Sequence, residues 1–155
     1  KSPIALYSSS LRRALMTATE ISREVALPIT PLDGMMEANL GEMEGITGEE
    51  LRTRYPETHA SWQHDPSKLS FPGGESMRQL RDRAWRAFGL IEKAYPEGLV
   101  VVVSHSFTIR AILCRFLGLP PSRLNRLRVD LGSISVLETN PGSRHVLTIN
   151  DKCHL

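Results

Sequence analysis

The sequence predicts a single α/β domain with a mainly parallel sheet, extending over residues 1–155. Two segments share the order apolar strand, polar turn and helix: IALY-SSS-LRRA from Ile4, and LVVVV-SHS-FTIRA from Leu99. A β-branched run without alternation, such as the second strand, is typical of a strand buried on both faces of a parallel sheet. The length of 155 residues suits one hydrophobic core, and no linker or internal repeat divides the chain.

The first half of the chain alternates predicted helices with irregular connections. After the serines of the first unit, apolar residues recur at helical spacing as far as Val25. Residues 28–46 show no period, and such long connections in compact domains usually carry function. The sequence TGEE from Thr47 matches a capping box and opens a short helix that Pro56 ends. We expect residues 56–75 to be a loop.

The second half begins with another capping box, SMRQ from Ser76, which opens a long helix closed by Pro96 and Gly98. The strand at residues 99–103 and its polar turn lead into a further helix that Gly118 ends. The last part predicts two strands around a turn at 140–142, namely Ile134 to Thr139 and Val146 to Ile149.

Composition and charge exclude several classes of protein. The chain is 41% hydrophobic and 23% charged, which is ordinary for a globular protein and argues against disorder. The longest apolar run, residues 99–103, is far shorter than the roughly 18 residues of a membrane span. Cys114 lies in an apolar helical stretch, so we expect a buried free thiol rather than a disulfide with Cys153. A reducing, cytoplasmic compartment is therefore expected.

One predicted helix carries the only basic cluster of the sequence, which consists of Arg78, Arg81, Arg83 and Arg86 with Trp85. The net charge, 19 − 17 = +2, neither requires nor excludes nucleic acid. A solvated helix face, paired in part with Asp82, is the simpler interpretation, because nucleic-acid binding would need a larger basic surface. We expect neither a nucleic-acid nor a membrane partner.

Both polar turns fall at the carboxyl ends of predicted parallel strands, where open α/β sheets bind ligands. Arg12 and Arg13 stand in a first helical turn, where the helix dipole disfavours a cation, and a bound anion would reverse that cost. The alternative is that both arginines are solvated. His105 is either a core histidine with a backbone hydrogen bond or a functional one, and its place at the end of a strand favours function.

The irregular loop contains Glu37, Glu42 and Glu44, for which a solvated acidic loop is the simplest interpretation. The sequence contains no C-x-x-C, H-E-x-x-H, Walker loop or G-x-G-x-x-G motif. We therefore expect no metal and no cofactor.

Five segments, taken in order, carry motifs of one known family. The segment YSSSLRRALMTA from Tyr7 matches the pattern Y-S-S-x-L-x-R-A-x-x-T-A. The segment EANLGEMEG from Glu37 matches E-x-x-F-G-x-W-E-G, with Leu40 and Met43 in place of the two aromatic residues. 

The other three segments are PGGES from Pro72, VVSHS from Val102 and NDKCHL from Asn150. The second of them matches V-V-S-H-G, with Ser106 where glycine is usual. Together the five segments resemble the histidine phosphatase (phosphoglycerate mutase-like) superfamily, in its small phosphatase branch. The resemblance extends from residue 7 to residue 155.

The resemblance implies a three-layer α/β/α sandwich and a metal-independent phosphomonoester hydrolase that acts on a small phosphorylated metabolite through a phosphohistidine. Arg13 would clamp the phosphoryl group, with His105 as the second histidine beside it and Ser106 offering a backbone N–H. Glu37 would be the general acid that protonates the leaving oxygen and then helps to activate water. We expect Arg13, Glu37 and His105 to meet at the carboxyl edge of the sheet.

Two other functions remain open at this point. A phosphoglycerate mutase of this family would carry a longer insertion than the 105 − 37 = 68 positions between Glu37 and His105, which favours the phosphatase. The family's nucleophilic histidine lies in an R-H-G motif, and no Arg-His-Gly occurs in the sequence. If that motif is truly absent, the alternative is a non-catalytic phosphate- or protein-binding module.

The chain begins where the family's second strand would begin, so we expect the first strand, its helix and the nucleophile to lie ahead of Lys1. By resemblance, that strand would lie between the strands that end near Tyr7 and Val103. Its loss would leave unpaired backbone groups, each costing on the order of 1–3 kcal/mol when buried. The expectation is that residues 1–155 alone form no stable monomer and are inactive.

Overall fold

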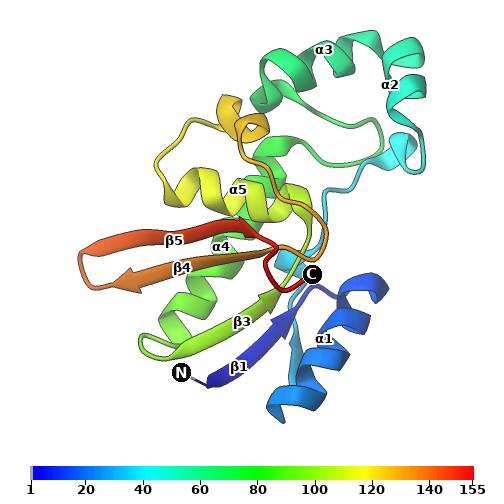
Figure 1. Cartoon of the computed structure of the whole chain (residues 1–155). Helices are drawn as coiled ribbons and strands as arrows, with labels where there is room; N and C mark the ends of the chain where they lie inside the picture. Colours follow the sequence, from blue (N-terminus) through cyan, green and yellow to red (C-terminus); the bar gives the residue numbers. More distant parts are fainter. Residues whose placement is uncertain (1) are drawn as a thin grey trace.

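A three-stranded parallel sheet forms the centre of the fold (Figure 1). The computed structural model describes residues 2–155. The strands are paired in the order β2-β1-β3, and both pairings are parallel. Their bounds are β1 (Pro3–Ser8), β2 (Ile29–Pro31) and β3 (Leu99–Val103). The predicted α/β class with a mainly parallel sheet is confirmed.

Helices and 3-10 turns make up most of the rest of the described residues. The α-helices are α1 (Arg12–Val25), α2 (Gly48–Arg54), α3 (Pro56–His64), α4 (Met77–Ala94) and α5 (Ser106–Phe116). The 3-10 turns are η1 (Asp33–Met35), η2 (Gly41–Met43), η3 (Pro66–Lys68) and η4 (Pro121–Arg126). Both predicted capping boxes are confirmed, at the start of α2 and at the start of α4. None of the helices in residues 2–155 combines the length and the apolar character that crossing a membrane requires.

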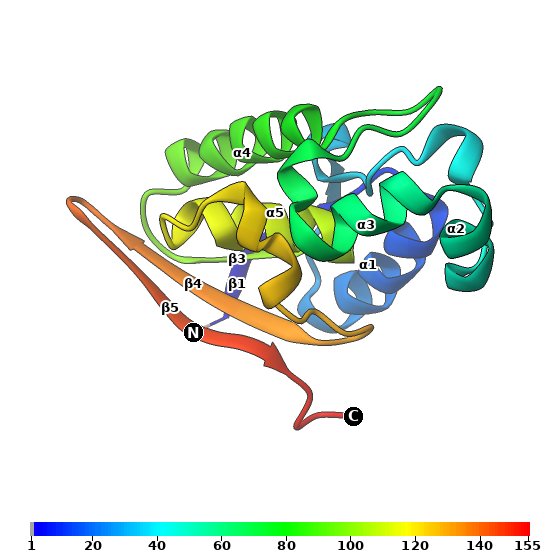
Figure 2. The ribbon, with the colours of Figure 1, turned by 90° about the horizontal axis from the view of Figure 1, so that it is seen from above.

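The sheet lies between two layers of helices (Figure 2). The helix α1 packs on one face, against β1 and β3, and α4 and α5 cover the other. Ala84 and Ile91 of α4 and Ile112 of α5 are buried there against Tyr7 and Val100 of the strands. Cys114 of α5 is a buried free thiol, as predicted. The arrangement is therefore the expected three-layer sandwich.

The C-terminal part forms a separate antiparallel hairpin, as predicted, from β4 (Ile134–Asn140) and β5 (Ser143–Asp151). Its attachment to the rest of the fold uses side chains. Leu137 packs against the same core as Val100, and Arg144 pairs with Glu92 of α4 at 2.8 Å.

β1 pairs directly with β3, so the expectation that a further strand belongs between them was wrong. Tyr7 is opposite Val102, and the N–H of Ser9 donates to the Val103 carbonyl at 2.9 Å. Among the described residues, β2 and β3 are the edge strands of the parallel sheet, and β4 and β5 each have one unpaired edge in the hairpin. For the same reason β3 is not buried on both faces, and Leu99 and Val102 remain 38% and 36% exposed.

The expected loop at residues 56–75 contains the helix α3 instead. Pro56 stands at the first helical position, where its fixed φ and missing N–H favour a helix start, so this proline both ends α2 and opens α3. Asn125 of η4 donates to the backbone carbonyls of Trp62 and Gln63, which holds the end of α3 against η4.

Candidate active site

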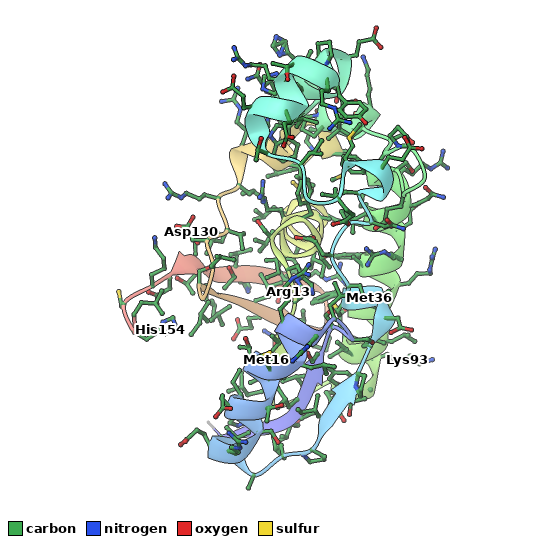
Figure 3. The ribbon with its side chains drawn as sticks, turned by 90° about the vertical axis from the view of Figure 1, so that its right-hand side faces the viewer. Arg13, Met16, Met36, Lys93, Asp130 and His154 are labelled. Carbon is green, nitrogen blue, oxygen red and sulfur yellow. The ribbon has the colours of Figure 1, made fainter. Side chains whose placement is uncertain are left out.

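The ends of β1 and β3 bring Arg13 and His105 into contact. The two strands are parallel neighbours, so their polar turns lie at the same edge of the sheet and lead into α1 and α5. Arg13 Nε donates to His105 Nδ1 at 3.3 Å. Figure 3 shows Arg13 at the end of α1 nearest to α5. Two of the residues singled out in the sequence therefore form one site.

His105 is held by hydrogen bonds on both ring nitrogens. Its side chain is buried, with 8% of its surface exposed, and its Nε2 lies 2.7 Å from Ser9 Oγ. Because Nδ1 accepts from Arg13, the proton of the neutral ring is on Nε2 and is donated to Ser9. Ser9 Oγ also accepts the N–H of Leu11 at 3.2 Å, which links the His105 ring to the turn before α1.

His105 is neutral in the structure. Burial lowers the pKa of its imidazole from 6.5 to about 4, and the positive charges of Arg13 and Arg83 act in the same direction. The role that the resemblance implies for His105, beside the phosphoryl group, requires a hydrogen-bond donor. The structure provides that donor at neutral pH through the Nε2–H of the uncharged ring.

The side chain of Glu37 lies at the first turn of α5, the helix that directly follows His105 in the chain. Its two carboxylate oxygens are 3.2 and 3.3 Å from the N–H of Phe107, and Oε1 accepts the N–H of Ala38 at 3.0 Å. A helix N-terminus favours a negatively charged group, and the side chain of Glu37 lies at the N-terminus of α5. The hydroxyl of Thr108 donates to the Met36 carbonyl at 2.6 Å and fixes the loop next to it.

Ser106 is the first residue of α5. Its hydroxyl donates to the Val129 carbonyl at 3.1 Å and accepts from Arg110 Nη2 at 2.6 Å, so the side chain is occupied. Its backbone N–H makes no hydrogen bond with the described part of the chain. This agrees with a contribution through the backbone rather than through the hydroxyl.

Arg83 is a site residue that the sequence analysis missed. It was assigned to a solvated helix face, which is wrong, because only 21% of its side chain is exposed. Its Nη1 donates to the carbonyls of Gly34 and Met36 at 3.0 and 2.8 Å, and its Nη2 donates to the Glu37 carbonyl at 2.8 Å. An ion pair of 2.6 Å with Glu75 holds the guanidinium in place. Arg83 thereby fixes the backbone that carries Glu37.

Two glycines allow the Glu37 loop and the PGGES segment to interlock. Gly41 has φ +55°, and a Cβ there would collide with the Pro72 carbonyl. A Cβ on Gly74 would collide with the carbonyl of Asn39. Glu75, which follows, accepts the N–H of Asn39 at 2.9 Å as well as pairing with Arg83. The close approach of these two loops therefore positions both Glu75 and Glu37.

The other acidic and basic candidates lie outside this arrangement. Glu42, Glu44 and Arg12 are exposed, as the simpler interpretation of each predicted. In residues 2–155, no group of three or more His, Cys, Asp or Glu side chains is placed to hold a metal ion.

Comparison with known proteins adds a family and relatives. Residues 1–152 match the family described as "Histidine phosphatase superfamily (branch 1)". "Phosphoserine phosphatase 1" of Hydrogenobacter thermophilus is 33% identical over 150 residues, which cover 97% of this chain and 71% of that protein. "Metal-independent phosphoserine phosphatase" of Arabidopsis thaliana is 34% identical over 115 residues, covering 73% of this chain and 48% of that protein.

Among solved structures, "Bacillus stearothermophilus YhfR" is similar with a TM-score of 0.89 and 27% identity. The match covers 98% of this chain and 76% of the YhfR chain. The strands, helices and site loops described above therefore follow the arrangement of a known structure nearly from end to end.

Proposed function

The chain belongs to branch 1 of the histidine phosphatase superfamily, and from this premise we propose that it hydrolyses a small phosphomonoester through a phosphohistidine intermediate. The observation that carries the proposal is the contact of Arg13 with His105, beside the carboxylate of Glu37 at the N-terminus of α5. Phosphatases among its relatives support the same reaction class.

Arg13 and His105 have complementary roles in holding the phosphoryl group. The Nε–H of Arg13 is used by His105, which leaves its two terminal nitrogens for a bidentate contact with phosphoryl oxygens. When substrate binds, the Nε2–H of His105 donates to a third phosphoryl oxygen instead of to Ser9 Oγ. The free backbone N–H of Ser106 adds a further donor. These groups stabilise the charge that spreads over the equatorial oxygens during transfer.

Glu37 acts first as an acid and then as a base. In the free site two backbone N–H groups donate to its side chain. To act as the acid, Glu37 must carry a proton when the substrate is bound beside it. It gives this proton to the leaving oxygen, and the resulting carboxylate then takes a proton from the water that attacks the phosphohistidine.

The nucleophile of this reaction is a second histidine. Both ring nitrogens of His105 are already bound, to Arg13 and to Ser9, so His105 is not placed to attack phosphorus. The resemblance gives that task to an R-H-G motif, which the 155 residues do not contain. The proposal is therefore tested on the complete gene product, with residues 1–155 alone as a chain that we expect to be inactive.

The names of two relatives make O-phosphoserine the first substrate to test. Sugar phosphates and an α-ribazole phosphate, which the resemblance to the small phosphatase branch suggests, are the next. We place the protein in the cytoplasm as one domain over residues 1–155, supported by the free thiols of Cys114 and Cys153. A small phosphorylated substrate is the partner that we propose, with no nucleic acid, membrane or metal.

The test measures phosphate release from O-phosphoserine and from p-nitrophenyl phosphate in the presence of a chelator. Rapid quenching after ³²P-labelled substrate should trap a phosphoprotein that is stable in base and labile in acid, as phosphohistidine is. Conversion of 3-phosphoglycerate to 2-phosphoglycerate without phosphate release would make the protein a mutase. Phosphate binding without turnover or labelling would make it a binding module.

A further inference from the structure

Arg110 differs from every other cationic side chain of residues 2–155. It is the only arginine or lysine that is partly buried and has no carboxylate within 4 Å. The other two partly buried arginines, Arg81 and Arg83, pair with Asp82 and Glu75. Burying a charge without a counter-charge is unfavourable, so an unpaired guanidinium in this position calls for an explanation.

Two aromatic rings and one hydroxyl contact the guanidinium of Arg110, whose side chain is only partly buried. Its guanidinium carbon lies 5.5 Å from the ring centre of Trp62 and 5.2 Å from that of Phe107. Nε and Nη2 both donate to Ser106 Oγ, at 3.2 and 2.6 Å. An arginine has five N–H groups, so three remain without a partner in the described residues, including both on Nη1.

The position of Arg110 is next to the proposed catalytic groups. Ser106, which it contacts, directly follows His105, and the N–H of Phe107 binds Glu37. Burial lowers the pKa of the Arg110 guanidinium, while the charge of Glu37 raises it, so this carboxylate is near enough to influence the guanidinium without pairing with it. Trp62 of α3 packs against Phe107 of α5, with ring centres 5.1 Å apart.

We propose that Arg110 is a second anion subsite of this active site. It binds a carboxylate or a further phosphate of the substrate while Arg13 holds the phosphoryl group that is transferred. The substrate class is thus a small phosphomonoester with another negative group, and the inference rests on the function proposed above. The planar fork of the guanidinium suits a two-oxygen contact, and the rings of Trp62 and Phe107 lie against it.

Matched pairs of substrates distinguish the binding of a second anion by Arg110 from a general effect of Arg110 on activity. O-phospho-L-serine and phosphoethanolamine differ only in the carboxylate, and fructose 1,6-bisphosphate and fructose 1-phosphate differ only in the second phosphate. In the complete gene product, we expect a higher kcat/KM for the more anionic member of one pair. The pair that shows the preference identifies the anion as a carboxylate or as a phosphate.

The variant Arg110→Gln should lower that preference about 10- to 100-fold, mainly through KM, as expected for a lost charged hydrogen bond. Arg110→Lys keeps the charge without the fork and should lower it less. The matched control is Arg86→Gln, which removes an exposed arginine that also has no carboxylate within 4 Å and should leave the preference unchanged.

Two results would overturn the subsite. One is a wild-type protein that does not distinguish the members of either pair, and the other is an equal loss of kcat/KM on both members in Arg110→Gln. If the wild type hydrolyses none of the four compounds, the proposed function fails instead. Calorimetric titration then still decides the subsite, because the wild type should bind O-phospho-L-serine about 10-fold more tightly than phosphoethanolamine, and Arg110→Gln should not.

Discussion

Arg13 donates its Nε–H to Nδ1 of His105 at 3.3 Å, between residues that are 92 positions apart in the chain. This single contact determines three properties of the site. It places the imidazole proton on Nε2, it puts a positive charge beside the ring, and it leaves the terminal nitrogens of the guanidinium without a hydrogen bond to the histidine.

Replacing Arg13 should change both catalysis and the titration of His105. Arg13→Lys removes the bidentate fork, so kcat for p-nitrophenyl phosphate should fall about 100- to 1,000-fold. In Arg13→Ala, loss of the positive charge should raise the pKa of His105 from about 4, although burial still keeps it below 6.5. A pH titration of the ring by NMR measures this shift. The exposed neighbour provides the control, and Arg12→Ala should alter neither quantity.

Removing the imidazole should affect turnover far more than folding. His105→Ala is expected to lower kcat for an aryl phosphate about 100- to 1,000-fold, because the ring acts mainly on the transferring group. His145→Ala, which removes an exposed ring from β5, is the control. A His105→Ala protein that melts at a much lower temperature while it keeps its specific activity would show that His105 is structural.

His105 should also make the free energy of unfolding depend on pH. Its pKa is about 4 in the folded protein and 6.5 when unperturbed, so the unfolded chain binds more protons between these values. The stability that results is present above pH 6.5 and is lost as the pH falls towards 4. The difference amounts to about 3 kcal/mol. In urea denaturation, the free energy of unfolding of His105→Gln should therefore fall by about that much less than that of the wild type between pH 6.5 and pH 4. Equal losses in the two proteins would contradict this prediction.

Arg83 should act as a positioning residue for Glu37. Arg83→Met leaves the partly buried Glu75 without its counter-charge and removes a donor from three backbone carbonyls, so we expect a loss of about 3–5 kcal/mol in the free energy of unfolding. Arg83→Lys keeps the ion pair but cannot reach all three carbonyls, and kcat should fall while the melting temperature changes less. Arg81→Met, which breaks a pair with Asp82 alone, should cost less than about 1 kcal/mol. Equal losses in the free energy of unfolding for Arg83→Met and Arg81→Met would contradict the positioning role of Arg83.

Much of the fold is predictable because its signals are local. A capping box is complete within four residues, so the starts of α2 and α4 are readable from Thr47 and Ser76. The apolar runs before the two polar turns fix where β1 and β3 end, and with them the place of Arg13 and His105. Pro56 is ambiguous by nature, since proline ends one helix as readily as it begins another.

The parts that the sequence did not predict depend on long-range pairing. The carbonyls that Arg83 binds are 46 to 49 positions away, so helical periodicity alone places this residue on the surface. The exposure of Val102 depends on which strand lies beside β3, and its own sequence does not contain that information. The tautomer of His105 follows from the geometry of Arg13 and Ser9, which only the assembled strands provide.

The separation of the two sheets has a consequence for amide hydrogen exchange. No backbone hydrogen bond of the described residues joins β3 to β4, whereas β1 is paired along both of its edges. Amides of Leu6 and Ser8 should therefore exchange only through global opening, while those of the β4–β5 hairpin exchange through a lower-energy opening of their own. Breaking the Arg144–Glu92 pair should speed exchange in the hairpin and leave β1 unaffected. The protein would then consist of two units that open with different free energies, and the proposed active site would lie in the more stable one.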